Sequence, residues 1–305
     1  MMDPRSIDSD PPNLLITGAG GFLGHSLCVL ARRHWSVHAQ YKTRAPAVQG
    51  IQCHQIDLTD DHKLAALVSA VRPRAIMHAA AIARAAQCQS APEATAAINV
   101  RVPVLLADLC ADAGIDLLFT STDLVFDGRR APYDETSPPD PVCVYGEQKA
   151  RAEAAVLKHW PRALICRLPL LFGLAPHADD YFGVQMLQSI AAGRPLNLFA
   201  DEFRTPVDNH DAALGLLTVL GRAQGVLHMG GRTRVSRHTL GLLMAQQMGI
   251  APRMIRSVPI DSIPTSYQRS PDCSLNSRRA YSLGYDPAPL TEAVARTVAQ
   301  FPAPG

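Results

Sequence analysis

Tyr145 and Lys149 are the two residues with the clearest capacity for acid–base chemistry in this chain of 305 residues. They stand four positions apart in a segment with helix-compatible spacing over 145–159, so their side chains share one helix face. A lysine ammonium beside a phenol favours the phenolate and lowers the pKa of the tyrosine toward the working pH. Such a pair can protonate a carbonyl oxygen or take the proton from a hydroxyl.

A threonine hydroxyl precedes this pair, just after the apolar run 117–119. The hydroxyl of Thr122 can hydrogen-bond a substrate oxygen beside the tyrosine. A Tyr-x-x-x-Lys pattern alone usually marks an exposed helix face, but here it follows a glycine-rich loop and a Ser/Thr strand end in that order. We therefore predict that Thr122, Tyr145 and Lys149 are catalytic, that a nicotinamide carries the hydride, and that Lys149 also holds its ribose.

The glycine-rich segment 17–24, Thr-Gly-Ala-Gly-Gly-Phe-Leu-Gly, is the predicted phosphate-binding turn. It lies between the apolar run 14–16 and a helix-compatible segment. Glycines at this spacing permit a sharp turn and a close approach of backbone amides to a pyrophosphate, which then faces the helix N-terminus. The alternative is a glycine-rich turn without a ligand. The predicted contacts are Gly18, Gly20, Gly21, Phe22, Leu23 and Gly24.

The Gly-x-x-Gly-x-x-Gly spacing resembles that of the extended short-chain dehydrogenase/reductase superfamily. The end of the second expected strand then selects the cofactor, since an acid there binds the ribose 2′-hydroxyl and a cation binds a 2′-phosphate. Segment 40–44 has no acid but contains Lys42 and Arg44, which favours NADP over NAD. In the alternative interpretation both cations are solvated surface residues.

Other strand ends complete the predicted cofactor site. Asp57 follows the third apolar run, where members of the superfamily hydrogen-bond the adenine amine; the alternative is a turn or N-cap acid. The small residues 79–81 leave room for the ribose and the nicotinamide, whereas His78 is interpreted as structural and Asn99 as a supporting residue. The remaining predicted contacts are Leu58, Ala79, Ala80, Ala81 and Leu168.

The elements that must position these residues alternate along the first half of the chain. Short apolar runs occur at 14–16, 37–39, 51–53, 75–77, 117–119 and 164–166, and helix-compatible segments lie between them at 22–33, 61–71, 92–113 and 145–159. Runs that are apolar throughout suit strands buried on both faces, and alternation with helices makes the sheet parallel. The predicted fold class is α/β, a doubly wound Rossmann-type sheet with a smaller C-terminal substrate lobe.

The domain limits follow from where this rhythm breaks. We predict a loose arm over 1–12, the NAD(P)-binding domain over 13–173, and a substrate-binding lobe formed by 174–207 and 231–305. The segment 208–230 is expected to return to the main sheet. Helices are expected over 180–192, 208–220 and 236–248. The prolines at positions 252, 259, 264 and 271 indicate a tail of loops.

Composition excludes several classes of protein. Twenty-nine basic and 27 acidic residues give a net charge of +2, without the electrostatic footprint of nucleic-acid or anionic-lipid binding. No unbroken apolar stretch approaches the length of a membrane span. The seven cysteines form no Cys-x-x-Cys pair, and a reducing, cytoplasmic location is expected. The histidines lack metal-ligand spacing and no Gly-x-Ser-x-Gly elbow occurs, so neither a metal site nor a serine hydrolase is predicted.

The stretch 121–128, Ser-Thr-Asp-Leu-Val-Phe-Asp-Gly, resembles the STDYVFDG stretch of dTDP-4-dehydrorhamnose reductases. Segments 167–173 and 204–207 are also similar to that family. The resemblance implies NAD(P)H-dependent reduction of a 4-keto sugar, with Thr122, Tyr145 and Lys149 at the catalytic positions. The substrate contacts that it implies are Asp123, Leu124, Phe126 and Arg204.

Two departures from this family concern the sugar more than the redox chemistry. Leu124 stands where the family usually has Tyr, and Phe22 where the reductases usually have Gln. Two alternatives stay open: an epimerase or dehydratase that keeps its cofactor bound, and an NADP-binding regulatory protein similar to the β subunit of methionine adenosyltransferase. The expected partner is a nucleotide sugar, and a homodimer is expected because members of the superfamily often form one.

Overall fold

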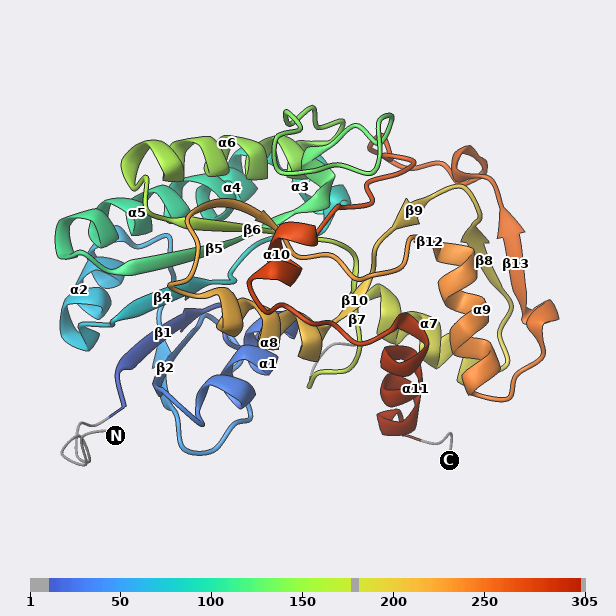
Figure 1. The fold of residues 1–305 in the computed structure, drawn as a ribbon, viewed down its shortest axis with the longest axis horizontal. Coiled ribbons are helices and arrows are strands. Elements are labelled where there is room, and N and C mark those ends of the chain that lie inside the picture. The colour runs from blue at the N-terminus through green and yellow to red at the C-terminus, as the bar shows by residue number, and fades with distance from the viewer. Residues whose placement is uncertain (1–10, 177–180, 303–305) are drawn as a thin grey trace.

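The computed structural model describes residues 11–176 and 181–302. Its centre is a seven-stranded parallel sheet with the order β11-β6-β5-β4-β1-β2-β3 (Figure 1). The expected arm 1–12 falls mostly outside the described residues, as does the start of the helix expected over 180–192. The strands are β1 (Asn13–Thr17), β2 (Ser36–Tyr41), β3 (Gln52–Gln55), β4 (Ala75–His78), β5 (Asp116–Thr122), β6 (Leu164–Leu168) and β11 (Gly225–His228).

The predicted doubly wound α/β sheet is confirmed, because helices cover both of its faces. Consecutive residues of β1 show how: Leu14 and Ile16 pack with α1 (Phe22–Ala31) and α8 (Asn209–Val219), whereas Leu15 packs on the opposite face. That opposite face is covered by α2 (Asp61–Val71), α5 (Val102–Ala113) and α6 (Val144–His159). Figure 1 shows these two helical layers above and below the sheet. The edge strand β3 is largely exposed, unlike the buried strand that its apolar run suggested.

The helical stretch 92–113 is interrupted where the sequence places Asn99. It consists of α4 (Pro92–Ala96), a π-helical turn (Ala97–Arg101) and α5. Asn99 lies buried in that turn, accepts a hydrogen bond from Ile82 N, and donates to Ile82 O and Gln148 Oε1. A π-turn of this kind is frequent at functional sites.

The same stretch is the one helical segment of the described residues that is long and apolar enough to cross a bilayer. Its mean hydropathy is 1.5 over Pro92–Ala113, and 39% of that window is buried. Val102, Leu106 and Cys110 pack against the sheet. The core helices of proteins in water pass the same test of length and composition, so this stretch is weak evidence for a membrane span.

The C-terminal lobe has its own hydrophobic core. Helices α7 (Phe182–Ala191), α9 (Arg237–Gln247) and α11 (Leu290–Gln300) share this core with the parallel pair β8 (Leu196–Phe199) and β13 (Ile255–Val258). Two short strand pairs and one short helix complete the described elements. They are β7 (Leu171–Phe172) with β10 (Val207–Asp208), β9 (Phe203–Arg204) with β12 (Val235–Ser236), and α10 (Arg278–Ser282).

The tail after position 250 is more ordered than the prolines suggested, and the expectation of loops alone was wrong. It contains β13, α10 and α11. Helix α11 buries Leu290, Ala293, Val294 and Thr297, which is an amphipathic spacing that starts directly after Pro289. The domain limits themselves stay a prediction. Strand β11, in the segment expected to return, pairs in parallel with β6.

Candidate functional site

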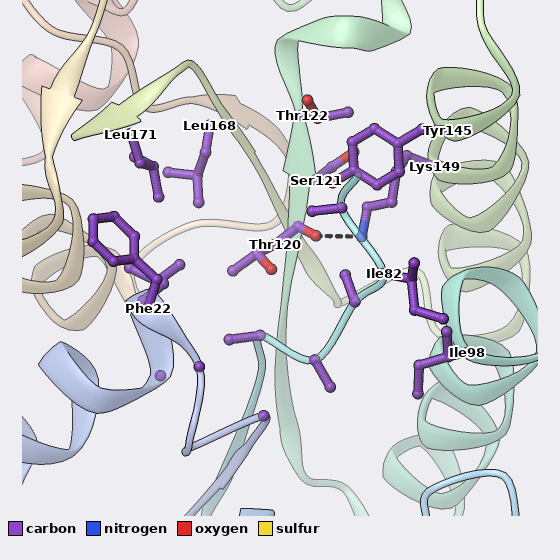
Figure 2. A pocket seen from close by; sticks show the side chains of 18 of the residues that line it. Phe22, Ile82, Ile98, Thr120, Ser121, Thr122, Tyr145, Lys149, Leu168 and Leu171 are labelled. Atoms are coloured by element: carbon purple, nitrogen blue, oxygen red, sulfur yellow. Dashed lines mark hydrogen bonds between the residues drawn. The ribbon is translucent and has the colours of Figure 1, made fainter. Parts of the chain in front are cut away.

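One large cavity, about 950 Å³, opens at the carboxyl ends of the parallel strands. This is the edge where ligands bind in doubly wound sheets. Figure 2 shows Phe22 on one side of the cavity and Tyr145 with Lys149 on the other. The structure brings most of the predicted site residues to its wall: Gly18, Gly20, Gly21, Phe22, Leu23, Gly24, Lys42, Arg44, Asp57, Leu58, Ala79, Ala80, Ala81, Thr122, Asp123, Leu124, Tyr145, Lys149, Leu168 and Arg204.

The glycine turn fits closely against its neighbours. Gly18 has a φ of +69°, and a Cβ there would lie 2.6 Å from Ala80 Cα. A Cβ at Gly20 would lie 2.0 Å from the main-chain oxygen of Arg44. Helix α1 begins directly after this turn, and Gly21 at its N-cap gives no side-chain hydrogen bond to the first amides. The partial positive charge of the helix N-terminus therefore faces the cavity.

Gln40 holds the turn to the sheet, a role that the sequence did not reveal. Its Oε1 accepts a hydrogen bond from Gly18 N at 3.0 Å, and its Nε2 donates to Ile56 O at 2.8 Å. The side chain is buried. The sequence signal that could have indicated this role is the position of Gln40 near the end of β2, directly after an apolar run.

Just after the ends of β2 and β3, a basic and an acidic side chain that line the cavity pair with each other. Lys42 Nζ lies 2.7 Å from Asp57 Oδ2, and both side chains are exposed to solvent. Asp57 also accepts hydrogen bonds from the amide and hydroxyl of Thr59. Hydrogen bonds from Lys42 and then Thr59 lower the pKa of Asp57 to about 2. Asp57 thus both accepts the local hydrogen bonds of Thr59, as a turn acid does, and forms an ion pair with Lys42 beside the cavity.

Tyr145 and Lys149 both lie on α6 and are both buried. Lys149 Nζ donates to Thr120 O at 2.6 Å (Figure 2) and lies 3.9 Å from the centre of the Phe119 ring. Burial lowers the pKa of Lys149 to about 7, and Glu153 acts in the opposite direction. A pKa this low lets the ammonium lose its proton near neutral pH.

The expected lowering of the tyrosine pKa is absent from this structure. Burial raises the pKa of Tyr145, and Cys88 and Asp123 raise it further. The physical reason is that the Lys149 ammonium is directed to a main-chain carbonyl and the phenol is enclosed in the protein. Tyr145 therefore carries its proton in this state, as a proton donor must.

Thr122 lies at the end of β5, next to a group of buried charged side chains. Its hydroxyl donates to Asp123 Oδ1 at 3.2 Å. Asp123 Oδ2 lies 3.2 Å from Arg204 Nε, with both side chains almost fully buried. Burial raises the pKa of Asp123 to about 6, against the lowering effect of Arg204. The predicted Asp123 and Arg204 thus form an ion pair in the cavity wall.

Glu202 extends this group into the C-terminal lobe. Its carboxylate pairs with Arg204 at 3.2 Å, with Arg237 at 2.6 Å and with Arg269 at 3.5 Å. Burial raises the pKa of Glu202, but the three guanidinium groups outweigh it and the pKa lies below its usual range. Arg237 also lines the cavity, together with Tyr181 and Phe182. Of Glu202 and its three arginine partners, Arg204 alone was predicted from the sequence. No motif marks the others, nor Tyr181 and Phe182.

Phe126 is the predicted substrate contact that the structure does not place in the cavity wall. Its side chain is fully buried, and its ring stacks on that of Tyr133 with centroids 4.0 Å apart. The Arg167 guanidinium lies 5.0 Å from its ring centre. Phe126 fills the core beneath the loop after β5, so the expectation that it contacts substrate was wrong. That expectation arose because Phe126 belongs to the stretch 121–128, whose other residues include true cavity residues.

Two other polar groups have structural partners. His78 Nδ1 lies 2.7 Å from Thr17 Oγ1, and burial lowers the pKa of this histidine to about 3. Among the described residues, Asp208, His210 and Asp211 form a grouping that could hold a cation. Arg296 pairs with both of these carboxylates, so a guanidinium already neutralises the grouping.

Comparison with known proteins places this geometry in a family. Residues 12–302 match the family described as the RmlD substrate binding domain. The chain is 30% identical over 247 residues to the probable low-salt glycan biosynthesis reductase of Haloferax volcanii, which covers 79% of this chain and 82% of that protein. It is 28% identical over 271 residues to methionine adenosyltransferase 2 subunit beta of Xenopus laevis, which covers 85% of this chain and 80% of that one.

Among solved structures, the fold is similar to that of the dTDP-4-dehydrorhamnose reductase from Bacillus anthracis in complex with NADP. The TM-score is 0.84 at 20% sequence identity, and the match covers 96% of this chain and 100% of that one. Together these findings confirm the resemblance that the stretch 121–128 predicted.

Proposed function

This chain belongs to the family of the RmlD substrate binding domain, and from that premise we propose that it is an NADPH-dependent reductase of a keto group on a nucleotide-linked sugar. The class of enzyme, an NAD(P)-dependent oxidoreductase, agrees with the reductase among its relatives and with the similar solved reductase in complex with NADP. The observation that carries the proposal is that the glycine turn at the start of α1, Thr122, Tyr145 and Lys149 all line one cavity.

The cavity wall fits a phosphorylated dinucleotide. The glycine turn packs so closely on Ala80 and Arg44 that Gly18 and Gly20 have no room for a side chain, and Gly21 at the N-cap of α1 offers no side chain to the first amides. Lys42 and Arg44 line the same cavity and would hold a 2′-phosphate. NADP is the proposed cofactor and NAD the alternative. When bound, the nicotinamide supplies the hydride.

The residues of the chain supply position and a proton. Tyr145, protonated and buried, would give its proton to the carbonyl oxygen of the substrate as negative charge develops there. The Thr122 hydroxyl, at the end of the neighbouring strand, would hold that oxygen. Lys149 would help to orient the nicotinamide ribose and would stabilise the phenolate that remains.

The group of buried charges at the cavity wall supports an anionic substrate. Asp123 and Glu202 carry two negative charges, and Arg204, Arg237 and Arg269 carry three positive charges. The group thus has one excess positive charge beside the cavity, which favours the diphosphate of a nucleotide sugar. Leu124 lines the same wall and offers an apolar surface instead of a hydroxyl.

The test is NADPH oxidation with a panel of keto sugars linked to nucleotides, followed at 340 nm. Turnover is expected with at least one member, and Tyr145→Phe is expected to lower kcat by about 10²- to 10⁴-fold while the Kd of NADPH stays within twofold. Thermal-shift titration with NADPH and NADH ranks the two cofactors. Unchanged turnover by the phenylalanine variant would reject the proposed proton donor.

A second candidate is a cofactor-binding regulatory protein. It is favoured by the 28% identity to methionine adenosyltransferase 2 subunit beta over 85% of this chain. The two candidates separate in one comparison: a regulatory protein binds NADPH without oxidising it and co-purifies in stoichiometric amount with an enzyme. The intact Thr122, Tyr145 and Lys149 set leads us to prefer the reductase.

The assembly and location of the protein also remain proposals. All seven cysteines are free thiols and only Cys53 is exposed, which fits a reducing compartment such as the cytoplasm. We propose that the lobe 174–207 with 231–305 carries the substrate. A homodimer is the proposed oligomer.

A further inference from the structure

Tyr181 reaches from the C-terminal lobe to the glycine turn of the sheet region. It is the residue before α7, and its ring stacks on that of Phe22 with centroids 4.5 Å apart and an interplanar angle of 22°. Its hydroxyl accepts a hydrogen bond from the main-chain N–H of Phe22 at 3.4 Å. Both side chains line the large cavity, and Figure 2 shows the Phe22 ring on its wall.

The amides of the glycine turn differ in what they bind. Gly18 N donates to Gln40 Oε1, Ala19 N to Gln40 O, and Gly21 N to Gly18 O, all within the sheet region. Phe22 N, the first amide of α1, instead donates to a side chain from the other lobe. The phenolic oxygen of Tyr181 thus occupies an acceptor position at the helix N-terminus, where a phosphate oxygen is favoured.

The Tyr181 side chain can exchange this contact at little cost. It is 41% exposed, so a small rotation of its ring gives up little packing. A phenolic hydroxyl donates as well as accepts, and on leaving Phe22 N it can donate to an anion bound at the same place. Tyr181 and Tyr145 line the same cavity, so both phenols face the space where the dinucleotide would bind.

We propose that Tyr181 is a cofactor-binding residue, whose hydroxyl yields the Phe22 amide to the pyrophosphate of the dinucleotide and then donates a hydrogen bond to that pyrophosphate. The inference rests on the proposed function. It also gives a role to Phe22, because the stacked ring of Phe22 keeps the tyrosine beside the helix N-terminus. The cofactor is thereby bound from both lobes.

The test measures cofactor affinity by calorimetry with the full chain. For Tyr181→Phe, which retains the stacked ring, we expect the Kd of NADPH to rise about tenfold, as for the loss of a hydrogen bond to a charged group. Adenosine 2′-monophosphate has the 2′-phosphate but no pyrophosphate, so its Kd is expected to stay unchanged. Tyr281→Phe is the matched control, since its hydroxyl donates to Gly230 O away from the cavity wall.

Each other outcome rejects the assignment. An unchanged Kd of NADPH in Tyr181→Phe would mean that the hydroxyl makes no contact with the cofactor. A lower Kd would mean that the tyrosine only competes with the phosphate for the Phe22 amide. Equal weakening of NADPH and adenosine 2′-monophosphate would mean a general disturbance of the cavity. A wild-type chain that binds neither NADPH nor NADH would reject the proposed function itself, and this inference with it.

Discussion

The two walls of the cavity differ in the chemical groups that form them. The wall on the sheet side consists of main-chain amides and small residues, with the glycine turn held by the buried Gln40. The wall on the lobe side includes the long charged side chains of Arg204 and Arg237, which pair with Glu202 outside the cavity wall. The first wall suits a ligand that is the same throughout a superfamily, whereas side chains on the second can change with the substrate. We therefore expect perturbations of the two walls to separate cofactor binding from lobe stability and substrate binding.

The largest effect is expected from Glu202→Gln on the lobe side. This change leaves three guanidinium groups in or near the interior without their shared carboxylate, and it should lower the free energy of unfolding by about 3 kcal/mol. Urea denaturation measures the change. Asp286→Asn is the control, because its pair with Arg232 is exposed and should contribute little. A Glu202 variant as stable as the control would show that the cluster does not support the lobe.

The next effect tests the sheet side through Gly20→Ala. The added Cβ would lie 2.0 Å from Arg44 O, so the segment that carries Lys42 and Arg44 must move away. We expect the Kd of NADPH to rise at least tenfold, about 1.4 kcal/mol. Gly50→Ala is the control: Gly50 has a φ of +76° with open space around it, and the change should affect stability only. Wild-type affinity in Gly20→Ala would contradict the close fit of this wall.

The smallest effect concerns the exposed edge of the sheet wall. The pKa of Asp57 is lowered to about 2 in the folded chain, below its ordinary value of 3.8. The carboxylate therefore stabilises the fold above pH 4, and this contribution is lost as the pH falls from about 4 to 2. Asp57→Asn should lose less stability than the wild type over that interval, by under about 1 kcal/mol because the pair with Lys42 is solvated. Parallel pH–stability curves for the two proteins would exclude the contribution.

The sheet-side wall was largely predictable from the sequence, and the reason is local. Apolar runs separated by helical spacing specify a parallel sheet, and Gly18 to Gly24 specify a turn whose geometry depends only on nearby backbone. The same logic reached Tyr145 and Lys149, because a spacing of four fixes their common helix face. It failed for Phe126, since a contiguous pattern does not reveal which of its side chains turn into the core.

The lobe-side wall was mostly hidden for a physical reason. Arg204 was found through a resemblance, but Arg237 and Tyr181 line the cavity only after distant segments have packed. The pairing of Glu202 with Arg237 likewise depends on that packing. The protonated state of Tyr145 was hidden as well, because it depends on burial that spacing does not encode. Helix α11 was predictable in principle, because its amphipathic spacing is present in the sequence. The prolines before it favoured a prediction of loops instead.

The path of the chain has a consequence for how the protein is made. Strand β11 completes one edge of the central sheet only after the chain has left it to form α7, β8 and β9. During synthesis the sheet region thus stays one strand short until the segment 225–228 has left the ribosome. The nascent β6 edge is open for that interval, and it is there that we expect chaperones to bind.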